Sequence, residues 1–244
     1  MVNLAVDFGN TRVKYGVFQD SKLIETWSGD VAAAKAQISK LQQTYVIDQV
    51  MICSTGNSKD FVTFVKKAGL SIEVLSSKTK LPFSNAYETP ETLGVDRMAL
   101  VAGAQKMHPG KHVLVIDAGT CVTYDFKDTA DVYQGGGISP GLGMRFRAMH
   151  EFTAGLPLVD YPEMPENVIG KNTKSAMRSG AIHGILAEIE GVISWYKSNY
   201  EPLTIILTGG DGQFLSSRLK NGIFANSNFL LEGLNYLILF NKNQ

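Results

Sequence analysis

Hydrophobic residues occur along the chain in short runs separated by turn residues, and this pattern predicts alternating strands and helices. Short β-branched runs bounded by Gly, Asn or Asp are typical of buried strands, whereas longer stretches with a period near 3.6 are typical of helices. The pattern predicts strands near residues 2–7, 12–18, 22–28, 47–53, 71–75, 112–117, 121–126, 131–138 and 203–208. It predicts helices near residues 31–43, 58–68, 94–107, 142–153, 173–199, 211–219 and 229–241, with Asp30 as the N-cap of the first.

One strand-turn-strand plan occurs twice. The first copy is Asn3-Leu-Ala-Val-Asp7-Phe-Gly-Asn-Thr11, and the second is Val113-Leu-Val-Ile-Asp117-Ala-Gly-Thr120. In each copy an apolar strand ends in Asp and is followed by a turn with Gly, then Thr, then a second strand. Such a repeat predicts two similar α/β lobes, with residues 1–110 in the first and 111–244 in the second. The stretch 76–92 has no period and contains two prolines, so we expect a long functional loop there.

Composition limits the function classes. The chain has 244 residues, 44% of them hydrophobic, and its 23 Lys and Arg residues balance 23 Asp and Glu residues. A zero net charge argues against a protein that binds nucleic acid or anionic lipid through bulk charge. The sequence shows no membrane-spanning run and no signal peptide, and we expect a soluble, cytoplasmic protein. Cys53 and Cys121 lie in predicted strands, and we interpret them as buried free thiols rather than a disulfide or metal pair.

Several common catalytic motifs are absent from the sequence. There is no P-loop, no dinucleotide-binding Gly-x-Gly-x-x-Gly after a strand and no Gly-x-Ser-x-Gly elbow. The four histidines show no metal-ligand spacing. Two arginines in the stretch 144–150 could indicate a nucleic-acid patch, but a solvated helix face explains them better. The apolar helix at 229–240 is expected to be buried.

The first turn combines groups that can bind phosphates. Backbone N–H groups and the Thr11 hydroxyl can donate to phosphate oxygens, while Asp7 can hold a divalent cation. Lys14 can neutralise phosphate charge. An ordinary hairpin turn explains Asp7 and Asn10 equally well. Gly209-Gly210 follow a strand and would let a nucleoside approach the backbone, although a strand-to-helix turn also accounts for them.

The order of these elements is the layout of the acetate-and-sugar-kinase, heat-shock and actin superfamily, and over nearly its whole length the chain resembles a type III pantothenate kinase. The matching stretches are 7–14 (Asp-Phe-Gly-Asn-Thr-Arg-Val-Lys), 93–97 (Leu-Gly-Val-Asp-Arg), 117–120 (Asp-Ala-Gly-Thr), 136–141 (Gly-Gly-Ile-Ser-Pro-Gly), 153–157 (Thr-Ala-Gly-Leu-Pro), 172–173 (Asn-Thr) and 208–210 (Thr-Gly-Gly). Two departures are Val95, where the family often has alanine, and Cys121, where a small residue is usual.

The resemblance implies an α/β fold of two duplicated actin-like (ribonuclease H-like) lobes with an ATP cleft between them. It implies ATP-dependent phosphorylation of pantothenate to 4'-phosphopantothenate, the first step of coenzyme A biosynthesis. The implied cofactors are Mg²⁺ with ATP and a monovalent cation, K⁺ or NH₄⁺, and the implied assembly is a cytoplasmic homodimer without nucleic-acid or membrane partners. Two alternatives stay open: a kinase for another small hydroxy-carboxylate or polyol, and a non-catalytic regulator on the same fold.

The resemblance also implies residue roles. Asp96 is the expected catalytic base, in accord with the need of phosphoryl transfer for a proton-accepting carboxylate. The expected pantothenate contacts are Tyr87, Gly94, Val95, Asp96, Arg97 and Thr173. The expected ATP contacts are Asp7, Phe8, Gly9, Asn10, Thr11, Arg12, Val13, Lys14 and Thr120. Asp7 is expected on the magnesium side and Asp117 at potassium.

Without the resemblance, Asp96-Arg97 would be explained as an acid at a helix start and a surface arginine. The helix near 94–107 carries apolar residues beyond what one lobe needs, at Met98, Ala99, Leu100, Val101 and Ala104. We therefore expect a subunit interface at this helix, with Thr173 supplied by the partner.

Overall fold

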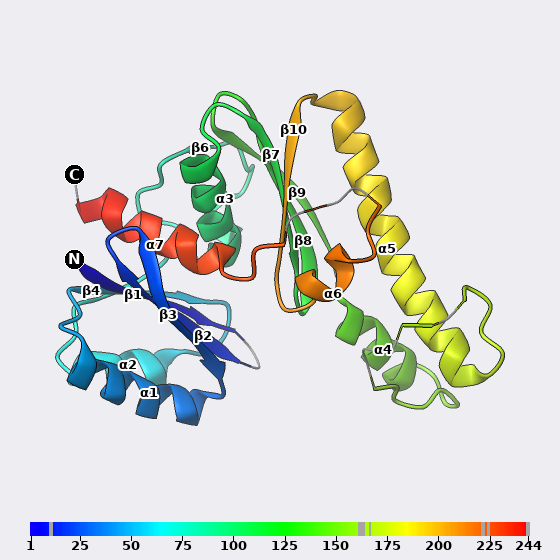
Figure 1. The fold of residues 1–244 in the computed structure, drawn as a ribbon, viewed down its shortest axis with the longest axis horizontal. Coiled ribbons are helices and arrows are strands. Elements are labelled where there is room, and N and C mark those ends of the chain that lie inside the picture. Colours follow the sequence, from blue (N-terminus) through cyan, green and yellow to red (C-terminus); the bar gives the residue numbers. More distant parts are fainter. Residues whose placement is uncertain (10–11, 161–163, 166, 221–222, 224, 243–244) are drawn as a thin grey trace. The chain divides into compact units, whose positions relative to one another are not determined.

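The computed structural model describes residues 1–9, 12–160, 164–165, 167–220, 223 and 225–242, and these form two five-stranded sheets with helices (Figure 1). The first sheet has the strand order β3-β2-β1-β4-β5 and the second has the order β10-β7-β8-β9-β6. The strands are β1 Val2–Phe8, β2 Val13–Gln19, β3 Lys22–Gly29, β4 Gln49–Ser54, β5 Ile72–Val74, β6 Ser84–Asn85, β7 His112–Ala118, β8 Cys121–Lys127, β9 Val132–Pro140 and β10 Leu203–Thr208. The helices are α1 Val31–Thr44, α2 Lys59–Lys67, α3 Val95–Met107, α4 Leu142–Glu151, α5 Thr173–Asn199, α6 Gly212–Ser216 and α7 Phe229–Lys242, with a 3-10 turn at Pro90–Thr92.

The predicted strands and helices are confirmed, with ends that differ by a few residues. The Asp30 side chain accepts a hydrogen bond from the N–H of Ala33 at 2.8 Å, as expected for an N-cap. The sequence did not predict β6 or the turn at Pro90–Thr92, which both lie inside the expected loop 76–92. The two-residue strand β6 is too short to leave a periodic signal.

The sequence repeat corresponds to a repeat of topology. In each sheet the strand that ends in Asp lies between the next strand of the chain and a later, parallel strand: β1 lies between β2 and β4, and β7 between β8 and β10. By contacts, the chain forms two compact units. The first comprises Met1–Gly110, Lys127–Gln134 and Asn228–Gln244, and the second comprises Lys111–Phe126 and Gly135–Ser227. The lobes 1–110 and 111–244 were defined by the sequence repeat, and their boundaries stay a prediction.

Strand β1 is buried on both faces, and this determines where Asp7 points. Leu4, Val6 and Phe8 belong to a core with α1 and α2, whereas Ala5 belongs to a core with α3 and α7. Since successive side chains of a strand point to opposite faces, Asp7 lies on the same face as Ala5. Asp7 therefore faces the side of the sheet that α3 and α7 cover.

Helices α3 and α7 pack with their backbones in close contact. A Cβ atom placed at Gly233 of α7 would lie 2.0 Å from the carbonyl oxygen of Ala99 in α3, and one at Gly103 would lie 3.4 Å from the Cα of Gly233.

The expectation that α3 leaves apolar surface for a partner is wrong for the single chain. The five residues on which it rested are each at most 2% exposed: Met98, Ala99, Leu100, Val101 and Ala104. Met98, Ala99 and Val101 pack in one core with residues of α7 and the first sheet.

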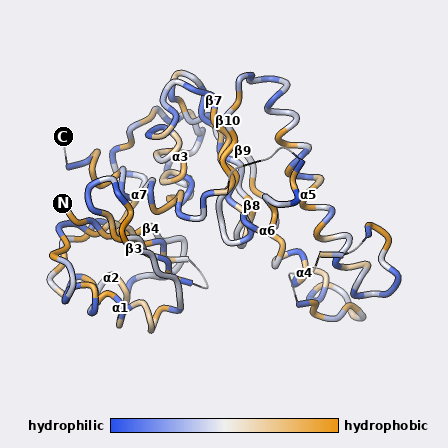
Figure 2. Tube along the Cα trace, viewed as in Figure 1, coloured by the Kyte–Doolittle hydropathy of each residue, from blue (hydrophilic) through white to orange (hydrophobic). Residues whose placement is uncertain are grey.

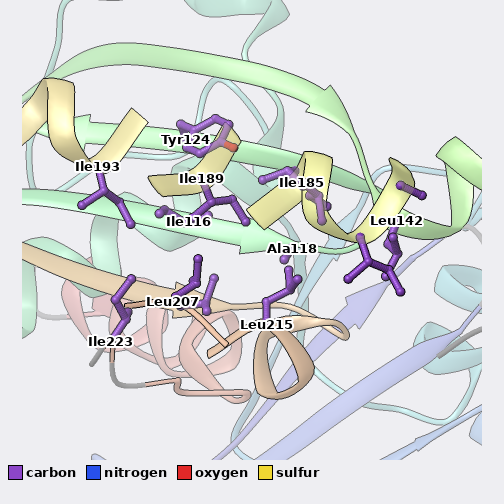
Figure 3. Packing of buried hydrophobic residues seen from close by; sticks show 14 of the residues in the cluster. Ile116, Ala118, Tyr124, Leu142, Ile185, Ile189, Ile193, Leu207, Leu215 and Ile223 are labelled. Atoms are coloured by element: carbon purple, nitrogen blue, oxygen red, sulfur yellow. The ribbon is translucent and has the colours of Figure 1, made fainter. Parts of the chain in front are cut away.

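The core of the second unit lies between its sheet and α5. Ile116 and Ala118 of β7 and Leu207 of β10 belong to one cluster with Ile185 and Ile189 of α5 (Figure 3). Figure 2 shows that the chain is hydrophobic along β7, which lies between β10 and β8, and along β10, which is the edge strand of this sheet.

A partly buried polar network joins α4, α5 and the sheet of the second unit. The Glu188 carboxylate accepts hydrogen bonds from the Tyr124 hydroxyl at 2.8 Å, the Ser139 hydroxyl at 2.5 Å and the Arg145 guanidinium. Burial by itself would raise the pKa of Glu188, but these hydrogen bonds lower it below its ordinary value. Arg145 also donates from Nε to the carbonyl of Pro140 at 2.9 Å, so the network holds the end of β9 against α4.

The contact between α3 and α7 leads to a stability prediction. Gly233→Ala should lower the free energy of unfolding by about 1–3 kcal/mol, because a methyl group there meets a backbone oxygen that cannot move aside. Gly180→Ala is the matched control, because Gly180 lies within helix α5 and a Cβ atom at this position would have no neighbouring atom within 4 Å. The control should gain about 0.5–1 kcal/mol. Urea denaturation of both variants measures the difference, and equal midpoints would contradict the prediction.

Candidate active site

The first turn joins β1 to β2. Phe8 and Val13 are the last paired residues of the two strands, and the N–H of Gly9 donates to the carbonyl of Arg12 at 3.0 Å. A Cβ atom at Gly9 would lie 3.1 Å from that carbonyl oxygen, which leaves little room for a side chain. Two of the predicted ATP contacts, Asn10 and Thr11, lie outside the described residues.

Asp7 and Lys14 face each other across the two strands. They are direct partners in the antiparallel register, so their side chains extend from the same face of the sheet. Burial and the negative charge of Asp96 together raise the pKa of Asp7 from 3.8 to about 6, against the opposing effect of the positive charge of Lys14. The structure thus brings Asp7, Lys14 and Asp96 within electrostatic range of one another.

The other predicted ATP contacts of the first turn differ in exposure. The side chains of Phe8 and Val13 are buried in the core on the opposite face, where the Phe8 ring lies 5.2 Å from the ring of Phe61. Arg12 is exposed. A ligand on the Asp7 side could therefore contact Phe8 and Val13 only through their backbone.

Asp96 lies in the first turn of α3. Gly94 is the N-cap residue, and the Oδ1 atom of Asp96 accepts a hydrogen bond from the N–H of Arg97 at 2.9 Å. A Cβ atom at Gly94 would lie 2.5 Å from the same Oδ1 atom, so only glycine leaves the carboxylate in this position. The predicted segment 94–97 therefore forms one structural unit at the start of a helix.

Arg97 is buried among aromatic rings. It is 4% exposed, and its guanidinium carbon lies 5.8 Å from the centroid of the Tyr87 ring and 6.0 Å from that of Tyr133. Both distances are in the range of cation–π contacts. The alternative interpretation of Arg97 as a surface arginine is therefore wrong. The structure places Arg97 beside Tyr87, and the pantothenate contacts expected of both residues stay a prediction. Sequence reasoning missed Tyr133, because a buried tyrosine in a predicted strand gives no signal beyond that of a core residue.

The second turn, from β7 to β8, is shorter than the first. The N–H of Gly119 donates to the carbonyl of Cys121 at 2.9 Å, and the N–H of Gly141 donates to the carbonyl of Thr120 at 3.1 Å. Thr120 is exposed, and Asp117 is half-buried at the end of β7. Neither Cys53 nor Cys121 forms a disulfide. Cys53 is fully buried as predicted, whereas Cys121 is only half-buried, so the prediction of a buried thiol is wrong there, because Cys121 is the first residue of β8 beside the turn.

Gly209 packs against the second turn. Its φ angle is +92°, and a Cβ atom there would lie 2.3 Å from the carbonyl oxygen of Ala118 and 2.4 Å from Oδ1 of Asp117. The strand-to-helix turn accounts for Gly209, because any larger residue would collide with the end of β7. A Cβ atom at Gly210 would have no atom within 4 Å, so the space around Gly210 could accept a side chain.

The remaining predicted contact, Thr173, lies elsewhere in the chain. It is the first residue of α5 and is exposed. The helix begins with a capping box in which the N–H of Ser175 donates to Oδ1 of Asn172 at 2.9 Å and the N–H of Asn172 donates to the Ser175 hydroxyl at 3.0 Å. Thr173 thus belongs to the second unit, whereas Tyr87 and Arg97 belong to the first.

Neither a cluster of metal-binding side chains nor the cavity in the first unit marks the predicted site residues. Among the residues that the structure describes, no three His, Cys, Asp or Glu side chains group so that they could hold a metal ion by themselves. A cavity of about 230 Å³ in the first unit is lined by none of the predicted site residues; its lining includes Phe18, Leu23, Lys106 and Glu232. In the described part of the chain, no helix has the length and hydrophobicity that a membrane span requires.

Solved structures with the same fold confirm the expected actin-like architecture. A Baf family transcriptional activator from Campylobacter jejuni superimposes with a TM-score of 0.65 at 19% identity, covering 99% of this chain and 100% of that chain. The activator of the 2-hydroxyisocaproyl-CoA dehydratase from Clostridium difficile, solved with bound ADPNP, gives a TM-score of 0.54 at 11% identity, covering 100% of this chain and 95% of that one. At these identities the likeness concerns the fold alone.

Sequence comparisons are more specific. The family model described as type III pantothenate kinase matches residues 3–195. The type III pantothenate kinase of Christiangramia forsetii is 49% identical over 245 residues and that of Bacteroides fragilis 40% identical over 245 residues, each covering 100% of both chains. That of Flavobacterium johnsoniae is 45% identical over 234 residues, 95% of each chain. With the family model and these full-length relatives in agreement, the chain belongs to the type III pantothenate kinase family.

Proposed function

We propose how the described residues carry out the reaction of this family, the ATP-dependent phosphorylation of pantothenate that begins coenzyme A biosynthesis. The observation that carries the proposal is the coupling between Asp7 and Asp96. Burial and the charge of Asp96 raise the pKa of Asp7 to about 6, while the charge of Lys14 lowers it, so two carboxylates share one partly buried region with Lys14. Phosphoryl transfer needs this combination of a proton acceptor, a cation-holding acid and a fixed positive charge.

Asp96 is the proposed general base. Its carboxylate is half-buried at the start of α3, and the hydrogen bond from the N–H of Arg97 occupies Oδ1. Oδ2 of Asp96 then accepts the proton of the pantothenate hydroxyl as that oxygen attacks the γ-phosphorus of ATP. The bond between the γ-phosphorus and the bridging oxygen breaks, and ADP leaves.

Asp7 is the proposed residue on the magnesium side. A buried carboxylate with a raised pKa fits a cation, because a positive charge relieves both its desolvation and its repulsion by Asp96. Magnesium is usually held by one or two carboxylates together with substrate phosphates, so one acid suffices. When bound, the ion neutralises charge on the phosphates. Lys14, opposite Asp7, adds a second positive charge.

Arg97 and Tyr87 are the proposed contacts for the pantothenate carboxylate and chain. A guanidinium pairs well with a carboxylate, and the buried position of Arg97 strengthens such a pair by excluding water. Gly94 and Val95 complete the segment, and Gly94 leaves the space that the Asp96 carboxylate occupies. We propose that Thr173 contributes from a partner subunit.

Asp117 and Thr120 are the proposed cation and ATP contacts of the second turn. Asp117 is the last residue but one of β7, as Asp7 is of β1. Asp117 would hold a large, weakly hydrated ion such as K⁺ or NH₄⁺, which does not need the rigid geometry that magnesium needs. Thr120 is exposed, so its hydroxyl can donate to a phosphate oxygen.

The homodimer is also a proposal. Exposed apolar side chains in the second unit support it, since such residues are common at subunit interfaces. The most exposed ones are Phe152 at 84%, Ile169 at 78% and Val168 at 68%. Cys53 and Cys121 form no disulfide, which is consistent with action in the reducing cytoplasm.

Asp96→Asn tests the catalytic base. Turnover should fall about 10²–10⁴-fold, because an amide cannot accept the hydroxyl proton. Glu91→Gln is the matched control, since Glu91 is an exposed acid shortly before α3, and it should keep normal turnover. Steady-state kinetics with ATP and pantothenate measure both variants. If Asp96→Asn turns over within a few-fold of the wild type, Asp96 is not the base.

Asp7→Asn tests the buried carboxylate through stability. The folded pKa of about 6 lies above the ordinary value of 3.8, so ionising Asp7 destabilises the fold as pH rises through this window. At pH 7.5 the variant should therefore have a higher urea midpoint than the wild type. The difference between the two midpoints should disappear near pH 4. The same variant should lose magnesium-dependent turnover. A difference in urea midpoint that does not change with pH would exclude the raised pKa of Asp7. Normal magnesium dependence of turnover in the variant would mean that Asp7 is only a turn residue.

Replacing the monovalent salt tests Asp117. Turnover at saturating magnesium should be higher in potassium or ammonium chloride than in sodium chloride at constant ionic strength, and Asp117→Asn should remove the difference. Initial rates in the three salts measure this response. Equal wild-type rates in all of them would contradict a cation site at Asp117.

A further inference from the structure

Tyr133 is a buried residue that the proposed reaction does not yet use. It lies in β9, within the part of that strand that belongs to the first unit, and its side chain is 0% exposed. The ring therefore presents no surface to a substrate. Any effect of Tyr133 on the reaction has to pass through the residues that it touches.

The residues that Tyr133 touches include the two proposed pantothenate contacts. Its ring stacks on that of Tyr87 with centroids 6.1 Å apart and an interplanar angle of 22°. The Arg97 guanidinium lies about equally far from both rings, at 5.8 Å from Tyr87 and 6.0 Å from Tyr133. Phe83 packs its edge against Tyr133 from another direction, with centroids 6.3 Å apart and planes at 70°. The Tyr133 ring is thus enclosed, whereas Tyr87 is half-buried.

The backbone of Tyr133 holds the same loop. Asn85 of β6 is paired with Tyr133 in parallel register, and the N–H of Ala86 donates to the Tyr133 carbonyl at 3.0 Å. The N–H of Tyr87 in turn donates to Oδ1 of Asn85 at 2.9 Å. The main chain therefore brings Tyr87 to this strand, where the Tyr133 ring contacts both Tyr87 and Arg97.

A buried guanidinium needs compensation for the water that it has lost. The electron-rich faces of aromatic rings provide part of it, and they do so at a defined position over the ring. Two stacked rings restrict the guanidinium more than one ring does. The arrangement keeps the Arg97 charge in place before a carboxylate arrives, and such preorganisation lowers the cost of binding.

We propose that Tyr133 is a positioning residue for pantothenate, which acts by holding Arg97 and Tyr87 in their binding orientation. The proposal rests on the proposed function, in which Arg97 and Tyr87 contact pantothenate. The contacts of Tyr133 described above are with Phe83, the segment 85–87 and Arg97. These residues all lie outside the first turn. Loss of the Tyr133 ring should therefore leave the ATP side unchanged.

The experiment compares Tyr133→Leu with Tyr133→Phe. Leucine removes the ring and should raise the KM for pantothenate roughly tenfold, from the combined loss of stacking and cation–π contact. The KM for ATP should stay within about twofold of the wild type, as expected for an effect confined to the pantothenate side. Phenylalanine keeps the ring and should restore the pantothenate KM. If Tyr133→Leu does not fold, Tyr133→Met fills the space without a ring and gives the same comparison.

Phe61→Leu is the control for a merely structural effect. Phe61 is 1% exposed on the opposite side of the first sheet, so its loss destabilises the unit without touching Tyr87 or Arg97. Urea denaturation should show a comparable loss of stability in both leucine variants, with a changed pantothenate KM only in Tyr133→Leu. Parallel changes in both KM values, or a phenylalanine variant as impaired as leucine, would overturn the proposal.

Arg97→Gln separates failure of this proposal from failure of the proposed function. If Arg97→Gln leaves the pantothenate KM unchanged, the assignment of Arg97 is wrong and Tyr133 loses its role with it. If Arg97→Gln raises that KM and Tyr133→Leu does not, the substrate assignment stands and the positioning role is wrong.

Discussion

The burial of Asp7 close to a second acid, Asp96, is the constraint on which the proposed site of the first unit depends. Burial, together with the charge of Asp96, raises the pKa of Asp7. In a flexible chain two such carboxylates would move apart, but here each belongs to a packed strand or helix. Asp7 ends a strand buried on both faces, and Asp96 begins a helix packed against that strand's sheet. The packing of the core therefore holds the two acids close to each other, as the roles proposed for them require.

Glycines make this arrangement possible by removing side chains at points of close approach. Gly233 lets α7 contact the backbone of α3, and Gly94 leaves room for the Asp96 carboxylate. In the second unit, Gly209 and Gly141 allow separate segments to meet the end of β7 and its turn. At these positions the glycines permit contact between protein atoms, so close packing explains them before any ligand is considered.

The two turns share the sequence of an Asp followed by Gly and Thr, but the residues that surround the Asp differ between them. Asp7 is opposed by Lys14 across a hairpin, so its turn carries both signs of charge. Asp117 instead has Gly209 beside it and a shorter turn that ends at an exposed Thr120. The two acids therefore have different surroundings, and the proposal assigns a different ion to each of them.

The sequence by itself determined the strands, the helices, the repeat of Asp7 and Asp117 at strand ends, and the family, because periodicity and short motifs are local properties of the chain. It also indicated Asp96 and Arg97 through a family motif. Only the tertiary structure decided that Arg97 is buried beside two tyrosines, that α7 packs against the apolar side of α3, and that Tyr133 stacks on Tyr87. These facts depend on contacts between residues far apart in the sequence, and a local pattern shows which face of an element is apolar without showing what will cover it.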